Sequence, residues 1–312
     1  MAAQSNPRVT IDKVDSTRPL AEWKPLLADF GRRRHLCYTM DFDTRALLLK
    51  EHSDSGDDEA RGHHTEIQKR LRDSLAKEYG SDQLEKKIEN FVAIGTKPFS
   101  ILAYHNQFFE QTRRSFVIGA YYPALLSACS LGERILNHLI LDLREFYKKT
   151  KQYKIVSRKA SFDNWQIAID VLEAWHILLP EVIVEFNALR LLRNRSIHFN
   201  AATYANLRDD ALAAIYHIRE IIDQQFTAFG KRPWFIEGTK GHIFIKRKWE
   251  ENPFVRTYYL PTCPFVGPYF AILFDGGLQF VDHADYGDGD WTDEEFAAVF
   301  EARSSEQLAN AS

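Results

Sequence analysis

Six consecutive residues, Arg193 to His198 (Arg-Asn-Arg-Ser-Ile-His), combine side chains that suit phosphodiester chemistry. The imidazole of His198 can transfer a proton near neutral pH, and the guanidinium of Arg193 carries a permanent charge that binds phosphate oxygens. The amide of Asn194 can orient either group. At 100° of rotation per residue, Asn194 and His198 share one helical face, whereas Arg193 and His198 lie about 140° apart. The same six residues could be the basic end of an ordinary helix, so the surrounding elements must decide between these alternatives.

This motif lies near the end of a helix that the apolar pattern predicts over residues 181–199. Arg193 falls on the apolar stripe of that helix. A buried guanidinium without a partner costs several kcal/mol, so Arg193 requires a carboxylate, the rim of a bundle or a subunit interface. Glu133, at the edge of the apolar face of an earlier helix, is the expected partner, and Arg190 adds a second cation. The stripe consists of Val182, Phe186, Leu189 and Ile197.

The segment between residues 96 and 230 contains five helical patterns and no linker rich in glycine or proline. We therefore expect one helical bundle over residues 96–230. The predicted helices cover residues 99–118, 123–147, 163–178, 181–199 and 206–229.

The chain before the bundle divides into two segments. Residues 1–65 are expected to form a partly flexible N-terminal extension with a short helix over residues 20–30. Residues 66–95 have only a thin apolar stripe and predict a peripheral helix, or two helices broken at Gly80.

The chain after the bundle, residues 231–312, has short β-branched and aromatic segments that predict a small β-rich region. The residues at 275–277 predict a hairpin turn, and Thr292 begins a capping box for a closing helix that extends to about residue 303. The predicted fold class is therefore mainly α. The predicted strands cover residues 242–249, 254–260, 269–274 and 278–283.

The bundle resembles the HEPN family (higher eukaryotes and prokaryotes nucleotide-binding domains). The resemblance rests on the segments 108–114, 121–125 and 131–134, and on Leu189 to His198. These segments are similar to the paired long helices and to the R-x4–6-H signature of the family. The resemblance covers residues 96–230, which is less than half of the chain.

The resemblance implies a HEPN-like helical bundle that forms a homodimer and brings two signature motifs into one cleft. Many members are metal-independent endoribonucleases of toxin or defence systems, which cleave RNA by attack of the ribose 2′-OH and need no cofactor. On this chain, His198 is implied as the general acid or base, and Arg193 as the group that binds the scissile phosphate. Asn194 matches a polar position of the family, and Glu133 matches a frequent acidic position.

One departure from the family concerns regulation. In the branch that pairs with nucleotidyltransferase antitoxins, the second residue after the histidine is a tyrosine that the antitoxin modifies. Asn200 occupies that position here, which argues against regulation by that route and leaves the cleavage chemistry unaffected. The resemblance still allows an antitoxin or another regulatory protein as a partner.

Two alternatives to catalysis remain open. The first is a non-catalytic HEPN module that binds RNA, a nucleotide or a partner protein, because inactive members of the family exist. The second is a helical interaction protein in which Arg193 and Glu133 form a buried tie and His198 is a polar residue at a helix end.

A basic segment at residues 148–159 contains six cations and no acid. It is predicted as the loop that joins the second and third helices of the bundle. Such a segment can bind RNA phosphates with an affinity that depends on salt, and a solvated loop explains it equally well. The run at residues 32–35 is also basic and is expected at the surface. The six cations are Lys148, Lys149, Lys151, Lys154, Arg158 and Lys159.

The composition excludes several classes of protein. The formal net charge is -3, so a nucleic-acid site would have to be a local patch. The three cysteines lie far apart and predict neither a disulfide framework nor a zinc site, and the histidines lack the spacing of metal ligands. Without an apolar segment of membrane-spanning length or a signal peptide, we expect a cytoplasmic protein that does not contact a membrane. P-loop, Rossmann and serine-hydrolase motifs do not occur.

Overall fold

The computed structural model describes residues 8–11, 31–37, 41–50, 58–197, 205–274, 278–283, 286–287, 289 and 291–309. The chain divides into two compact units. Residues 40–227 form one unit, here the helical unit. Residues 1–39 and 228–312 together form the other, here the discontinuous unit.

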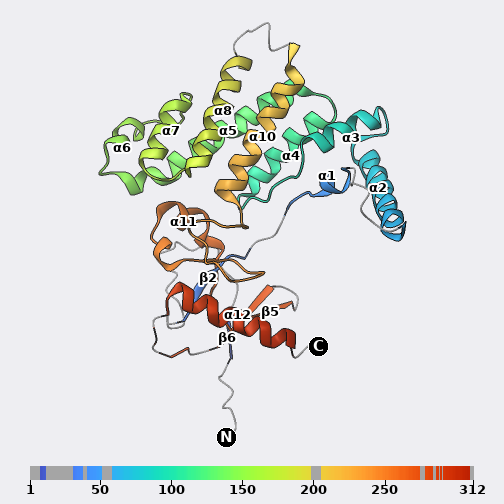
Figure 1. The fold of residues 1–312 in the computed structure, drawn as a ribbon. Coiled ribbons are helices and arrows are strands. Elements are labelled where there is room, and N and C mark those ends of the chain that lie inside the picture. The colour runs from blue at the N-terminus through green and yellow to red at the C-terminus, as the bar shows by residue number, and fades with distance from the viewer. Residues whose placement is uncertain are drawn as a thin grey trace. The chain divides into compact units, whose positions relative to one another are not determined.

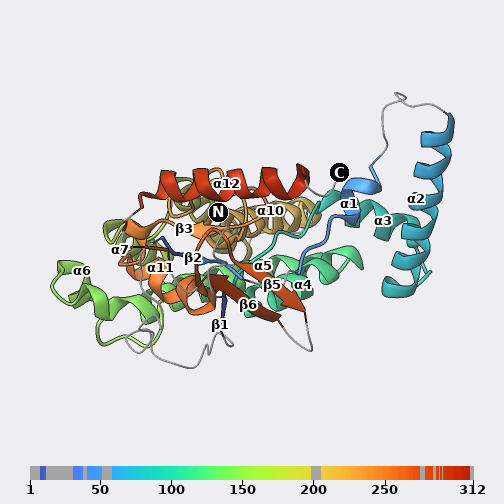
Figure 2. The same ribbon diagram turned by 90° about the horizontal axis from the view of Figure 1, so that it is seen from below.

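The helical unit is built around a long central helix, α5 (Figures 1 and 2). This helix contacts α4, α7, α8 and α10, and its apolar face is buried from Leu125 to Leu143. The helices of the unit are α1 (Arg45–Leu48), α2 (Asp58–Tyr79), α3 (Leu84–Ala93), α4 (Ala103–Val117), α5 (Tyr121–Leu143), α6 (Lys151–Val156), α7 (Trp165–Ala174), α8 (Pro180–Ile197) and α10 (Leu207–Phe226), with a 3-10 helix at Arg144–Tyr147.

All five predicted bundle helices are confirmed, as α4, α5, α7, α8 and α10. Apolar periodicity predicted them because each buries one face in the shared core. The predicted break at Gly80 is also confirmed: Gly80 has a φ of 83°, in the left-handed region that favours glycine, and it separates α2 from α3. The segment 66–95 is less peripheral than predicted, because α3 contacts α4 and buries Phe91.

The discontinuous unit contains two three-stranded antiparallel sheets. One has the strand order β1-β6-β5 and the other β3-β2-β4. A cluster of phenylalanines fills its core, with Phe244, Phe270 and Phe280 meeting Phe296 and Phe300. The strands are β1 (Arg8–Ile11), β2 (Arg33–His35), β3 (Phe244–Ile245), β4 (Phe265–Val266), β5 (Ala271–Phe274) and β6 (Leu278–His283); the helices are α11 (Pro253–Tyr258) and α12 (Asp293–Ala309), with 3-10 turns at Arg247–Trp249 and Leu260–Thr262.

The expected division at residue 65 is wrong, because the N-terminal strands belong to the same unit as the C-terminal region. β1 pairs with β6 in the register Arg8 to His283, and β2 pairs with both β3 and β4. The surface position expected for residues 32–35 is wrong for the same reason. Arg32 is 0% and Arg33 is 1% exposed.

The two buried arginines are accommodated by carboxylates from distant parts of the chain. Arg32 Nε lies 3.2 Å from Asp282 Oδ2, and Arg33 Nε lies 2.7 Å from Asp293 Oδ1. Paired and hydrogen-bonded charges can be buried, whereas unpaired ones cannot.

The predicted strand at 254–260 is also wrong, since this segment forms α11 and a 3-10 turn. Asn252 caps α11: its side chain accepts hydrogen bonds from the N–H groups of Phe254 and Val255. Pro253 occupies the first helical position, which its fixed φ favours. The strand predicted at 242–249 is reduced to β3, the one at 269–274 begins at Ala271, and the one at 278–283 is confirmed. The predicted helix at 20–30 and turn at 275–277 lie outside the described residues.

Candidate functional site

The motif identified in the sequence lies at the C-terminal end of α8. Val182, Phe186 and Leu189 are fully buried, which confirms the predicted apolar stripe at these three positions. Arg193 lies on the same stripe and remains 22% exposed. His198 follows the last described residue of α8 and lies outside the described residues.

The guanidinium of Arg193 is held by two groups from neighbouring helices. Its Nη2 lies 2.9 Å from Glu133 Oε2 of α5, which confirms the expected partner. Its Cζ lies 5.6 Å from the centre of the Trp165 ring, and Trp165 Nε1 donates to the same Glu133 oxygen at 3.0 Å. Because Glu133 is 36% exposed, this ion pair lies at the rim of the bundle and not in its interior. The orientation of Arg193 is therefore fixed while part of it remains accessible.

Gly132 makes this arrangement possible. A Cβ atom at this position would lie 2.7 Å from Trp165 Cη2 and 2.8 Å from Leu189 Cδ2, which is closer than such atoms approach. Glycine therefore lets α7 and α8 contact α5 beside Glu133, and this contact brings Trp165 under Arg193.

A pocket of about 320 Å³ opens between α7 and α8. One wall is the end of α8 and the other is the beginning of α7. The pocket brings together three residues predicted for the site, Arg190, Arg193 and Asn194. Glu133 does not line the pocket but forms the ion pair with Arg193. The lining residues are Asp163, Asn164, Trp165, Gln166, Arg190, Arg193 and Asn194.

The charges around this pocket favour an anion. Arg190 Nε is buried without a hydrogen-bond partner among the described residues, and its Nη2 contacts Asn187 Oδ1 at 3.4 Å. The N-terminal turn of α7 contributes the positive end of a helix dipole. Asn164 Oδ1 caps that turn by accepting from Ile167 N at 3.3 Å. Two arginines and a helix N-terminus thus face a pocket in which Asp163 is the one acidic lining residue.

Cys129, on α5 near Arg193, is the one cysteine close to the motif among the described residues. Burial raises the pKa of its thiol to about 12, although the charge of Arg193 opposes that rise. The thiol is therefore neutral at physiological pH. Since the thiolate is the nucleophilic form, Cys129 contributes packing and not nucleophilic catalysis.

The basic segment 148–159 is not the loop that was predicted. Its centre forms the short helix α6, and all six cations are exposed. Lys148 Nζ lies 2.8 Å from Glu145 Oε2. None of the six lines the pocket, but the segment continues directly into the pocket wall, with Lys159 four residues before Asp163.

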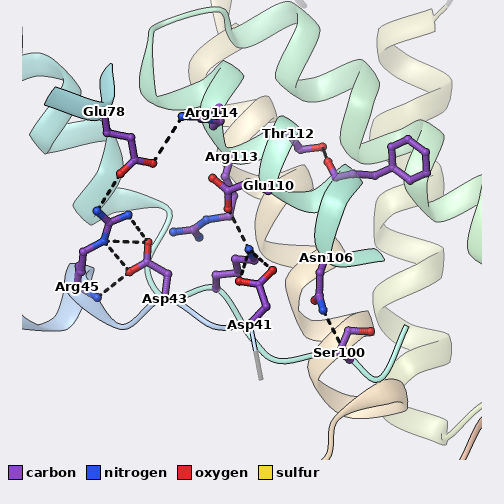
Figure 3. A network of polar contacts seen from close by, with 12 residues as sticks. Asp41, Asp43, Arg45, Glu78, Ser100, Asn106, Glu110, Thr112, Arg113 and Arg114 are labelled. Carbon is purple, nitrogen blue, oxygen red and sulfur yellow. Dashed lines mark hydrogen bonds and ion pairs between the residues drawn. The ribbon is translucent and has the colours of Figure 1, made fainter. Parts of the chain in front are cut away.

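A second polar cluster in the helical unit joins residues 41–45 to the helices (Figure 3). Arg45 contacts both Asp43 and Glu78 at 2.8 Å, and Lys97 contacts Asp41 at 3.0 Å. Because these charges pair with one another, the cluster fixes residues 41–45 against α2 and α4. It is a structural network, unlike the open pocket.

The start of α7 is the part of the pocket that sequence reasoning missed. The pattern predicted a helix from residue 163, and Asn164 is a typical N-cap. The position of α7 relative to α8 depends on how both helices pack on α5. This packing cannot be predicted from a local sequence pattern.

In the part of the chain that is described, no three His, Cys, Asp or Glu side chains are grouped as metal ligands. None of the described helices has the length and apolar character needed to cross a membrane.

Comparisons with protein-family models, with curated proteins and with solved structures find no match. The likeness to the HEPN family therefore rests on the residues named above, and function is inferred from the pocket.

Proposed function

We propose that the helical unit is a HEPN-type, metal-independent endoribonuclease whose pocket between α7 and α8 binds the scissile phosphate of RNA. The observation that supports this proposal is the composition of the pocket. Arg190, Arg193 and Asn194 face the N-terminal turn of α7 across about 320 Å³. Arginine forks and helix N-termini are both groups that bind phosphate.

In the proposed reaction the ribose 2′-oxygen attacks the adjacent phosphorus, and the bond from phosphorus to the 5′-oxygen of the next nucleotide breaks. The products are a 2′,3′-cyclic phosphate and a free 5′-hydroxyl. Arg193 stabilises the charge that develops on the phosphate oxygens. Its link to Glu133 occupies Nη2, so other N–H groups of the guanidinium serve the phosphate.

His198 supplies the proton transfer in this proposal. As a base it removes the proton of the 2′-OH, or as an acid it protonates the leaving 5′-oxygen. A homodimer would bring two such sites together, and the family resemblance suggests a toxin or antiviral defence role.

The test is cleavage of structured RNA by the purified chain in excess chelator, beside the His198→Ala and Arg193→Gln variants. We expect the wild type to cut and both variants to lose at least about 100-fold in rate, the lower end of the usual contribution of a general acid or base. Cleavage that persists in the His198 variant, or that requires a divalent metal, would refute the catalytic assignment.

Matched controls are available on α2. His63 is exposed, and Arg70 is 75% exposed and forms an i,i+4 pair with Glu66. The variants His63→Ala and Arg70→Gln remove the same side-chain types far from the pocket along the chain. We expect both to cleave at the wild-type rate. Their loss of activity would point to a general effect of lost charge.

A non-catalytic binding module is the second candidate, favoured by the Arg193–Glu133 ion pair. This pair already neutralises one of the two pocket cations. If neither the wild type nor any variant cuts RNA while the wild type still binds it, this candidate replaces the first. Glu133→Gln then tests the pocket directly, because glutamine keeps the acceptor for Trp165 and removes the negative charge. Tighter phosphate binding in this variant would support anion binding at Arg193.

The third candidate, a helical interaction protein, assigns the same pair a purely structural role. It predicts that Arg193→Gln lowers the melting temperature of the chain strongly and that RNA does not bind. The rim position of the pair argues for a smaller effect, since partly exposed ion pairs contribute about 0–1 kcal/mol.

A further inference from the structure

We propose that residues 144–159 form a second RNA subsite, separate from the pocket, in which Phe146 stacks on an unpaired base and the cations of α6 bind the flanking phosphates. This inference rests on the proposed function, because it takes the ligand to be RNA. It goes further by assigning a second binding site for RNA outside the cleavage pocket, and by naming single-stranded RNA as the ligand.

The segment is held rigidly, which distinguishes it from a solvated loop. Thr150 caps α6 by accepting from Tyr153 N at 3.3 Å, and it also accepts from Trp175 Nε1 at 3.0 Å. The rings of Tyr147 and Trp175 stack at 4.6 Å with 6° between their planes. The side chains of Tyr147 and Thr150 therefore fix the segment to Trp175 at the end of α7, which lies beside α6 in Figures 1 and 2.

The far end of the segment is also tied down. Arg144 Nη1 donates to the carbonyl oxygens of Val156, at 3.1 Å, and of Lys159, at 2.7 Å. Because Arg144 stands at the start of the segment and Lys159 at its end, the backbone forms a closed platform. A platform that is already ordered loses less entropy when it binds a ligand.

The charge on this platform is largely uncompensated. Lys148 pairs with Glu145, but none of the other five cations forms an ion pair within the described part of the chain. Lys151 and Lys154 are three residues apart on α6 and so project from the same side of the helix. Exposed cations that share one side can contact successive phosphates of one strand.

Phe146 supplies the feature that points to a single strand. Its ring is 51% exposed at the start of the platform, next to the basic residues. An exposed aromatic ring beside cations is the arrangement by which proteins stack unpaired bases while binding the backbone. A duplex keeps its bases stacked on one another and offers none to Phe146.

The platform and the pocket are joined by a short, fixed connection. Phe162 is clamped to α5 at both backbone groups, since its N–H donates to Asn137 Oδ1 at 2.7 Å and its carbonyl accepts from Asn137 Nδ2 at 3.1 Å. Asp163, the next residue, lines the pocket. Asp163 is four positions after Lys159, so their Cα atoms lie within about 14 Å of each other. One strand can therefore occupy both places.

The test measures binding of the full chain to a single-stranded oligonucleotide of 12 deoxynucleotides, which has no 2′-OH and so is not a substrate for the proposed cleavage. Fluorescence anisotropy is recorded from 50 to 200 mM salt. For single strands each phosphate contact contributes about 0.7 to the slope of log affinity against log salt. We expect Lys151→Gln/Lys154→Gln to reduce that slope by about 1.4.

The control removes equal charge elsewhere. Lys69 and Lys77 are exposed on α2, and the variant Lys69→Gln/Lys77→Gln should leave the slope at its wild-type value. Equal slopes for the two double variants would overturn the proposal. The proposal would also be overturned if the wild type bound poly-glutamate or phosphatidylserine vesicles as tightly as the oligonucleotide, and if the α6 variant lost affinity equally for both. Binding would then depend on negative charge alone.

Phe146 is tested separately with 2-aminopurine in the oligonucleotide. Stacking on Phe146 should quench its fluorescence on binding. Phe146→Ala should lose the quenching and bind at least about 5-fold more weakly, whereas Phe146→Trp should retain both. Unchanged quenching in Phe146→Ala would refute the stacking role.

Failure of this inference is distinguishable from failure of the proposed function. If the chain cuts no RNA but the α6 variant shows the reduced slope, the platform stands and the nuclease assignment falls. If Arg193→Gln abolishes cleavage and the α6 variant binds with an unchanged slope, the nuclease stands and the platform falls.

Discussion

Acidification from pH 7 to pH 5 is expected to destabilise the discontinuous unit by about 2 kcal/mol through His35 alone. The imidazole of His35 is 5% exposed, and its Nε2 lies 2.9 Å from Nδ1 of His242. Burial, followed by the nearby His242, lowers the pKa of His35 from 6.5 to about 3. The other ring nitrogen, Nδ1, is buried and has no hydrogen-bond partner among the described residues.

The sign of the effect follows from the lowered pKa. The neutral form is favoured in the folded state, so the unfolded chain binds more protons once the pH falls below about 6.5. The stabilisation is therefore fully present above that pH and is lost as the pH falls towards the folded pKa. Each pH unit in this window costs about 1.4 kcal/mol, which gives the 2 kcal/mol expected at pH 5.

The assay must report on this unit alone, because burial also lowers the pKa of His105, in the helical unit, to about 3. Hydrogen exchange read by mass spectrometry meets that need. The quantity measured is the protection factor of the amides of Ile236 and Phe296, because this ratio of intrinsic to observed exchange rate corrects for the effect of pH on intrinsic exchange. These amides donate to Phe244 and Thr292, so their protection follows the stability of the phenylalanine core.

The variant His35→Gln isolates the contribution of this imidazole. Glutamine can still donate to His242 and does not titrate, so the loss between pH 7 and pH 5 should shrink by about 2 kcal/mol. An equal loss of protection in the variant and the wild type would refute the assignment to His35.

Three further predictions concern packing, buried charge and capping. Gly132→Ala should destabilise the helical unit by about 1–3 kcal/mol in chemical denaturation, because the new methyl group overlaps Trp165; an unchanged midpoint would show that Trp165 can move freely. Asp282→Asn should destabilise the discontinuous unit by about 3–5 kcal/mol, because the buried Arg32 loses the negative charge that lies 3.2 Å from its Nε, and retention of wild-type protection in β6 would contradict this. Asn252→Ala should lower the free energy of unfolding by about 1 kcal/mol in thermal denaturation, because α11 loses its N-cap. Asn252→Asp should retain most of the stability in the same measurement, and an equal loss in both variants would contradict the capping role.

The helical unit was largely predictable because its helices are long and amphipathic. The ion pair between Arg193 and Glu133 could also be predicted, since each lies on or beside the apolar face of its own helix. The segment 254–260 was predicted as a strand because its aromatic composition outweighed the capping signal of Asn252 and Pro253, which begins α11.

The burial of the basic run at 32–35 could not be predicted from local composition. Arg32 is neutralised by Asp282, 250 residues further along the chain. A run of arginines is ordinarily solvated, and only the pairing of β2 with β3 and β4 takes this one into a core. Long-range pairing of this kind leaves no periodic signal in the sequence.

The pairing of β1 with β6 and of β2 with β3 and β4 has a consequence for the order of events during synthesis. The first strands of this unit leave the ribosome before residues 40–227, and their partners follow afterwards. At about 5–20 residues per second, β2 waits roughly 10–40 s for β3. During that interval Asp282 and Asp293, which pair with Arg32 and Arg33 in the folded unit, have not yet been synthesised. Charged side chains on an unpaired strand oppose its association with other strands, so we expect the arginines that lie buried in the finished unit to keep the nascent strand from premature pairing.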